Sequence, residues 1–209
     1  MIQIPRDRSL LLFLSAFVFL FVTGFALRTG LTLPGEAELC VSISDSMGLL
    51  LPLFKVISVY GGTILALFVS ILLTVIRKTR MLGIACLLMT VLVWVSVDVV
   101  VKNIVCRDRP CVYLGIEPLV AIHSLYSFPS CHAAVTFAFV GFFIRYPRIS
   151  VPVALYGVLM AVSRVAVYAH YPTDVVCGAV FGVIFGVAFC LLASGWSLGH
   201  GNDLTDSID

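Results

Sequence analysis

Charged side chains are scarce in this chain. Only 11% of its 209 residues are Asp, Glu, Lys or Arg, and its mean hydropathy is +1.13. A soluble domain carries about 25% charged residues, so this composition excludes an ordinary soluble fold and indicates a polytopic membrane protein. The formal net charge is only +2. We therefore expect no nucleic-acid partner.

Motifs for metals and redox chemistry are also missing. The seven cysteines are irregularly spaced without a CxxC pair, which excludes a zinc ribbon and a thioredoxin-like motif. Cys106 and Cys111 are close enough in sequence for a short-loop disulfide, although we expect free thiols. The chain has no carboxylate cluster suited to Mg²⁺, and no cysteine is followed six residues later by arginine, as cysteine-phosphatase chemistry requires. We expect no metal and no cofactor.

Long apolar runs predict an all-α membrane domain. A helix rises 1.5 Å per residue, so about 20 apolar residues cross the ~30 Å hydrocarbon core. The mixed composition of residues 29–54 predicts a short helix at the membrane surface. We expect one domain, residues 1–194, followed by a disordered acidic tail, residues 195–209. The six predicted transmembrane helices are residues 9–27, 56–76, 81–101, 130–144, 150–168 and 173–193.

The distribution of cations predicts the orientation. With a cytoplasmic N-terminus, seven cations fall in inner segments: Arg6, Arg8, Arg77, Lys78, Arg80, Arg145 and Arg148. On the outer side, three remain once the candidate site residues are set aside: Arg28, Lys55 and Arg107. The positive-inside rule then places both termini in the cytoplasm and the polar motifs on the outer face.

One group of polar residues runs Ser163-Arg164, five residues, His170, three residues, Asp174. Pro172 ends the preceding helix, and Asp174 falls in the first turn of the next, where the positive helix end favours a carboxylate. We expect the His170 Nδ1–H to donate to that carboxylate, which fixes the tautomer and leaves Nε2 as a nucleophile. Taken alone, a histidine–aspartate pair that only joins two helices explains these residues equally well.

Two earlier groups also have ordinary explanations when each is taken alone. Pro129-Ser130-Cys131-His132 begins a predicted span, where unpaired N–H groups suit phosphate oxygens, but an N-cap serine beside a core histidine also fits. Lys102 and Arg109 stand at a helix end and in the loop after it. Lys102 is expected to pair with Asp98, one helical turn back.

Arg164 is the hardest residue to explain in this way. It stands in an otherwise apolar helix, and a buried guanidinium is costly unless a group such as a bidentate phosphate offsets it. Arg107 and Asp108 are predicted to be solvated loop charges. Because all three groups fall on one predicted membrane face, we predict a single phosphate-binding site there.

In this order, the patterns K-x6-R-P, P-S-x-H and S-R-x5-H-x3-D resemble the signature of the type 2 phosphatidic acid phosphatase (PAP2) superfamily. The resemblance covers the region from the third to the sixth predicted span, and the six-span layout resembles the membrane branch of that family. One position departs from the pattern, because Cys131 stands where the family usually has glycine. The resemblance implies a membrane-bound lipid phosphatase.

The resemblance also implies a role for each site residue. His170 would be the nucleophile that forms a phosphohistidine, Asp174 would orient it, and His132 would be the general acid and then the base. Phosphoryl transfer needs positioning and charge neutralisation, which cations can supply without a metal. The phosphoryl oxygens would be held by Lys102, Arg109, Ser130, Cys131 through its amide, and Arg164.

An outer-face site at headgroup level predicts that the substrate is the phosphate of a membrane lipid. Candidates are undecaprenyl or another polyprenyl diphosphate, phosphatidylglycerophosphate, phosphatidic acid and the phosphates of lipid A. A lipid-to-lipid phosphotransferase would use the same residues. A non-catalytic lipid transporter or scaffold could keep the pocket, although transport requires neither a nucleophile nor a proton donor. The sequence leaves the oligomeric state open.

Overall fold

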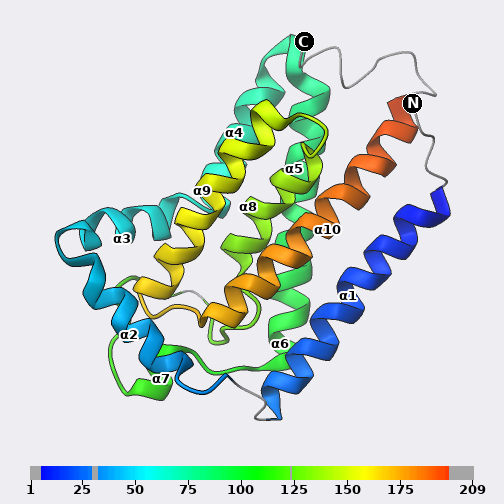
Figure 1. Cartoon of the computed structure of the whole chain (residues 1–209). Coiled ribbons are helices and arrows are strands. Elements are labelled where there is room, and N and C mark those ends of the chain that lie inside the picture. Colours follow the sequence, from blue (N-terminus) through cyan, green and yellow to red (C-terminus); the bar gives the residue numbers. More distant parts are fainter. Residues whose placement is uncertain (1–5, 30–32, 123, 198–209) are drawn as a thin grey trace.

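The computed structural model describes residues 6–29, 33–122 and 124–197, and all the regular structure in these residues is helical (Figure 1). Helices α2 (Glu36–Met47) and α3 (Leu51–Tyr60), joined by the one-turn η1 (Gly48–Leu50), lean away from the other helices at one side. Shorter elements are η2 (Arg77–Thr79) and α7 (Pro110–Leu114). The bundle consists of α1 (Arg6–Arg28), α4 (Thr63–Val75), α5 (Arg80–Trp94) continued by η3 (Val95–Val101) and α6 (Lys102–Val105), α8 (Cys131–Phe142), α9 (Pro147–Ala166) and α10 (Pro172–Ser197).

The protein is a multi-pass membrane protein by the length and composition of its helices. Helices α4 and α8 are apolar but shorter than a full span, so the count of six spans stays a prediction. The helix predicted at the membrane surface also stays a prediction. Within the described residues, five stretches are long and apolar enough to cross a membrane: Arg8–Arg28, Glu36–Tyr60, Arg77–Leu114, Pro147–Ala166 and Pro172–Ala193.

The predicted span of residues 56–76 is not one continuous helix. Helix α3 ends at Tyr60 and α4 begins at Thr63, with Gly61 and Gly62 between them. Gly62 has φ −90° and ψ −113°, which lies outside the helical region. Two consecutive glycines have low helix propensity, so the chain changes direction here instead of continuing as a span.

Helices α8 and α10 pack closely because α10 presents glycines to the backbone of α8. A Cβ on each would lie only 2.0–2.5 Å from a carbonyl oxygen of α8 or of its N-cap residue, so no larger residue fits without a shift. The close approach lets the Ser130 N–H donate to the Asp174 carbonyl oxygen at 3.0 Å. It therefore joins the second polar motif to the third. The glycines are Gly178, Gly182 and Gly186.

Two buried clusters hold the helices in place. The larger one lies between α1, α5, α8 and α10 and includes an edge-on contact between Phe13 and Phe185, with ring centroids 4.8 Å apart. The smaller one attaches α2 to the ends of α7, α9 and α10. Cys40 of α2 belongs to it, and its Sγ lies 3.8 Å from the carbonyl oxygen of His170. Helix α2 therefore covers the turn that carries the third motif.

The three polar motifs lie at one end of the bundle. Helix α6 ends there, α8 begins there, and the turn from α9 to α10 lies beside them (Figure 1). Helix α1 begins and α10 ends at the opposite end (Figure 1). Helix α10 runs to Ser197, three residues into the segment predicted as a disordered tail, and the rest of that segment, residues 198–209, lies outside the described residues.

Candidate active site

The turn between α9 and α10 positions His170. Helix α9 ends at Ala166, and Tyr168 adopts a left-handed conformation with φ 60° before Pro172 starts α10. The His170 side chain is 1% exposed, and its Nδ1 lies 2.7 Å from the carbonyl oxygen of Ser127. Because a carbonyl can only accept, Nδ1 carries the proton and Nε2 keeps its lone pair.

Asp174 does not make the hydrogen bond predicted for it. Its Oδ2 lies 3.7 Å from Nδ1 of His170, which is longer than a hydrogen bond. Oδ2 accepts instead from the main-chain N–H of Tyr171 at 2.9 Å. Asp174 is the third residue of α10, and a carboxylate at this position reaches back to the N-cap N–H. The Ser127 carbonyl therefore fixes the tautomer, and the Asp174 carboxylate lies near His170 without a hydrogen bond to it.

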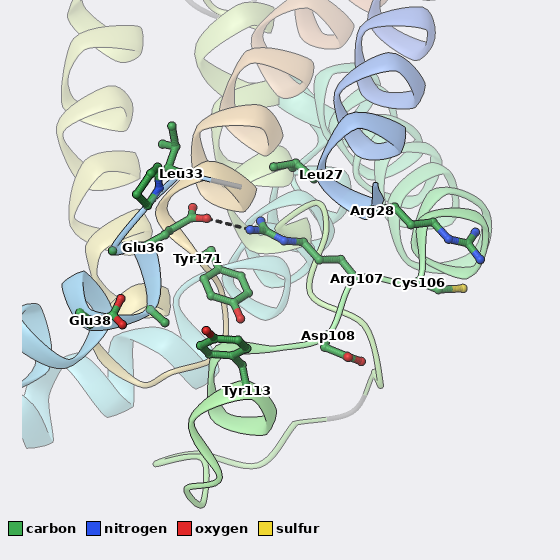
Figure 2. Close-up of a pocket in the computed structure, with 13 residues that line it drawn as sticks. Leu27, Arg28, Leu33, Glu36, Glu38, Cys106, Arg107, Asp108, Tyr113 and Tyr171 are labelled. Carbon is green, nitrogen blue, oxygen red and sulfur yellow. Dashed lines mark hydrogen bonds and ion pairs between the residues drawn. The ribbon is translucent and has the colours of Figure 1, made fainter. Parts of the chain in front are cut away.

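Arg107 is not the solvated charge that was predicted. It is buried and pairs with Asp174 Oδ1. It also pairs with Glu36 Oε2 at 2.7 Å (Figure 2). Its Nη1 donates to Thr173 Oγ1 at 2.8 Å, and its guanidinium lies 4.1 Å from the centroid of the Tyr171 ring. A buried guanidinium needs acceptors of this kind, since an unpaired one is strongly destabilising. Asp108 is exposed, as predicted.

Glu36 ties α2 to this network. Its Oε1 accepts from the main-chain N–H of Thr173 at 2.7 Å and from the Thr173 hydroxyl, while Oε2 accepts from Arg107. The side chain is buried at the start of α2, just after the left-handed Gly35. One carboxylate thus joins α2, the loop after α6 and the first turn of α10.

The cations of the motifs surround the His170 imidazole. Burial lowers the pKa of His170 well below its usual value, and the positive charges of Arg109, Arg164 and Lys102 lower it further. The electrostatic influence of His132 also reaches the ring. His170 therefore stays neutral, with an unprotonated Nε2, at pH values where a free histidine is already protonated.

Two of these cations have no carboxylate partner in the described part of the chain. Arg109, 3% exposed, donates from Nε to the Ser124 carbonyl at 2.9 Å and from Nη1 to the Ala169 carbonyl at 2.6 Å. Arg164, 6% exposed, donates from Nη1 to the Ser58 carbonyl and hydroxyl at 2.9 and 2.7 Å, and its Nε has no described partner. Buried positive charge without a counter-charge favours binding of an anion.

The predicted pair between Lys102 and Asp98 is confirmed. The Lys102 ammonium lies 2.5 Å from Oδ1 of Asp98, one turn back, and the lysine is buried. Asp98 belongs to the π-helix η3, and Lys102 begins α6 directly after it. Single π-helical turns are frequent at functional sites. The carboxylate holds the ammonium in place and leaves it further donors.

The start of α8 contributes the second motif. Ser130 is the N-cap residue, yet its hydroxyl makes no capping bond and is buried without a partner in the described residues. The alternative that Ser130 is only a helix-capping serine does not explain this buried, unpaired hydroxyl. Cys131 is the first residue of α8, and its Sγ lies 4.0 Å from Oγ1 of Thr63. His132 follows and is partly exposed. The N–H groups of this first turn suit phosphate oxygens.

The structure brings all three motifs together and adds residues that the sequence did not assign to the site. These are Glu36, Ser58, Arg107 and the carbonyl of Ser127. Glu36 could have been noticed in the sequence, because it is one of only eleven acidic residues and follows a Pro-Gly turn. The role of the Ser127 carbonyl could not, because every residue has the same main-chain carbonyl. All seven cysteines, including Cys106 and Cys111, are free thiols, as expected.

A cavity of about 370 Å³ lies beside this site, between the end of α1, the start of α2 and the loop after α6 (Figure 2). Arg107, Glu36 and Tyr171 line one part of it. Arg28 and Asp108 line another part (Figure 2). The cavity therefore borders the carboxylate–guanidinium network and not the motif residues themselves.

A comparison with protein families decides where this chain belongs. The sequence model of the PAP2 superfamily matches residues 82–196, more than half of the chain. The chain belongs to the PAP2 superfamily. The match includes the three motifs, so the resemblance seen in their spacing is confirmed.

Individual relatives match this PAP2 protein over shorter stretches. It is 36% identical over 89 residues to the lipid A 1-phosphatase of Rhizobium johnstonii, covering 36% of each chain. It is 35% identical over 95 residues to the decaprenylphosphoryl-5-phosphoribose phosphatase of Mycobacterium tuberculosis, covering 44% of this chain and 50% of that protein. The matches thus span between about a third and half of the length of these relatives.

One solved structure was also found to be similar. It is the crystal structure of the first transmembrane PAP2 type phosphatidylglycerolphosphate phosphatase from Bacillus subtilis. The TM-score is 0.49 at 21% sequence identity, and the superposition covers 92% of this chain and 96% of that one.

Proposed function

We propose that this PAP2 protein is a metal-independent phosphatase that hydrolyses a phosphomonoester or diphosphate of a membrane lipid through a phosphohistidine on His170. The observation that carries the proposal is the environment of this imidazole. Its tautomer leaves the lone pair of Nε2 free to attack, and the buried guanidiniums of Arg109 and Arg164 act on it without carboxylate partners. A phosphate supplies the negative charge that these guanidiniums lack.

In the first step, Nε2 of His170 attacks phosphorus. The N–P bond forms as the P–O bond to the lipid breaks, and the electron pair leaves with the lipid oxygen, which His132 protonates as general acid. The phosphorylated ring becomes cationic because Nδ1 keeps its proton. The Ser127 carbonyl at 2.7 Å and the Asp174 carboxylate at 3.7 Å stabilise that charge.

In the second step, a water attacks the phosphohistidine. His132 takes a proton from the water, the P–N bond breaks, and its electron pair returns to Nε2. Negative charge spreads over the phosphoryl oxygens in both steps. Lys102, Arg109 and Arg164, the Ser130 hydroxyl and the main-chain N–H of Cys131 neutralise this charge or hold these oxygens.

For the substrate we propose a lipid whose phosphate lies at headgroup level. Two relatives are named for lipid A and for decaprenylphosphoryl-5-phosphoribose, which supports the class of lipid phosphates. Polyprenyl diphosphates, phosphatidylglycerophosphate and phosphatidic acid belong to the same class.

We also propose that the site faces the outside of the cell membrane, with both termini in the cytoplasm. The excess of cations at the end opposite the motifs supports this orientation.

The test is phosphate release by the purified protein in detergent from four lipids: a polyprenyl diphosphate, phosphatidylglycerophosphate, phosphatidic acid and lipid A. We expect release from at least one, abolition in His170→Ala and slow residual release in Asp174→Asn. Wild-type release in His170→Ala would refute the nucleophile. Phosphate appearing on a second lipid instead of in solution would indicate a phosphotransferase, and no turnover of any lipid would favour a transporter or scaffold.

A further inference from the structure

The break between α3 and α4 lies directly against the ring of His132. Gly62 is buried at this break, 70 positions before the histidine. A Cβ on Gly62 would lie 2.1 Å from Cδ2 of His132, 2.7 Å from Cγ and 2.9 Å from Cβ. Only glycine lets the main chain approach the imidazole this closely.

Gly62 cannot easily withdraw from the ring, because the segment that leads into it is anchored at two points. The Tyr156 hydroxyl of α9 donates to the Gly61 carbonyl at 2.7 Å, and Arg164 binds Ser58 in the last turns of α3. A side chain at position 62 would therefore displace the imidazole rather than the backbone.

The displacement is large on the scale of catalysis. Bringing the Cβ–Cδ2 distance from 2.1 Å to an ordinary contact of 3.4 Å requires a shift of about 1.3 Å. Cδ2 is bonded to Nε2, so the proton-carrying edge of the ring moves with it. A misplacement of about 1 Å can cost roughly 10²-fold in rate.

We propose that Gly62 is a positioning residue that sets the His132 imidazole for proton transfer to the leaving group. The inference rests on the proposed function, in which His132 is the general acid. If Gly62 positions His132, a side chain at position 62 slows only those reactions whose leaving oxygen needs a proton. A purely structural role would slow all substrates alike.

The experiment compares Gly62→Ala with the wild type on two substrates, by the release of leaving group in the first turnover. Phosphatidic acid releases an alkoxide, which needs protonation, whereas p-nitrophenyl phosphate releases a stabilised phenolate. We expect a loss of about 10²-fold on phosphatidic acid and little change on p-nitrophenyl phosphate. His132→Ala should show the same pattern, and the double variant should be no slower than His132→Ala.

Gly61→Ala is the matched control, because its Cβ would meet the Tyr156 hydroxyl at 2.1 Å and not His132. It should keep the wild-type ratio of the two rates. An equal loss on both substrates in Gly62→Ala, or a loss that adds to that of His132→Ala, would overturn the inference.

Stability provides a second readout that does not depend on turnover. Removing the ring removes the two shortest contacts, at 2.1 and 2.7 Å, and leaves only the contact with Cβ at 2.9 Å, so the Gly62→Ala/His132→Ala double variant should melt at a higher temperature than Gly62→Ala alone. If Gly62→Ala fails to fold, the double variant should still fold, so the comparison remains informative. A double variant no more stable than the single one would overturn the inference. A wild type that releases phosphate from none of the four lipids would instead contradict the proposed function, and the comparison of melting temperatures would still test the contact between Gly62 and His132.

Discussion

Replacing Arg107 by alanine tests the carboxylate–guanidinium network most directly. The change leaves Glu36 and Asp174, 5% and 0% exposed, without their shared cation. Breaking a buried ion pair costs roughly 3–5 kcal/mol, because the remaining charge is left uncompensated. A chain of this size loses about 2–4 °C of Tm per kcal/mol, so we expect Arg107→Ala to lower the Tm by on the order of 10 °C.

The assay is thermal unfolding in detergent, followed by turnover of whichever lipid phosphate the wild type cleaves. Arg148→Ala is the matched control, since Arg148 is exposed and should cost no more than about 0–1 kcal/mol. Glu36→Gln in the Arg107→Ala background should restore part of the Tm, because it removes one uncompensated charge. A Tm for Arg107→Ala equal to that of Arg148→Ala would refute the assignment of a buried network.

Three further predictions concern the chemistry. Because burial and neighbouring cations lower the pKa of His170, its neutral form should persist as pH falls through 6.5, so the acid limb of kcat/KM should lie below pH 6.5; a limb at or above 6.5 would contradict this. Activity should survive EDTA while vanadate inhibits it, and a loss in EDTA that Mg²⁺ restores would exclude the metal-free mechanism. Cys131→Gly should keep turnover because the main-chain N–H remains, whereas Cys131→Val should lower it by adding bulk at the first turn of α8. A collapse of Cys131→Gly equal to that of His170→Ala would make the thiol a covalent participant.

The sequence was sufficient for everything that depends on neighbours along the chain. Apolar runs predicted where most of the helices lie, since burial in lipid demands a continuous stretch of apolar side chains. The pair between Lys102 and Asp98 was predicted because residues four apart face each other on one helix. The position of Asp174 in the first turn of α10 followed from Pro172 in the same way. The motif spacing also led to the PAP2 superfamily.

The span of residues 56–76 shows where this reasoning fails. Its hydropathy is continuous, so composition predicts one helix, but Gly61-Gly62 interrupts it. Hydropathy measures whether a segment can be buried and not the direction in which it runs. The break brings Gly62 against the ring of His132, 70 residues away in the sequence, and hydropathy carries no information on such a contact.

The remaining contacts of the site were decided by tertiary structure. His170 was expected to bind the nearest carboxylate, but the first turn of α10 takes up that carboxylate, and a main-chain carbonyl 43 residues away orients the ring. Arg107 and Glu36, 71 residues apart, pair because α2 packs over the α9–α10 turn. A charge takes whichever partner the packing brings within reach, and a carbonyl is the same in every residue, so the order of side chains along the chain cannot specify either contact.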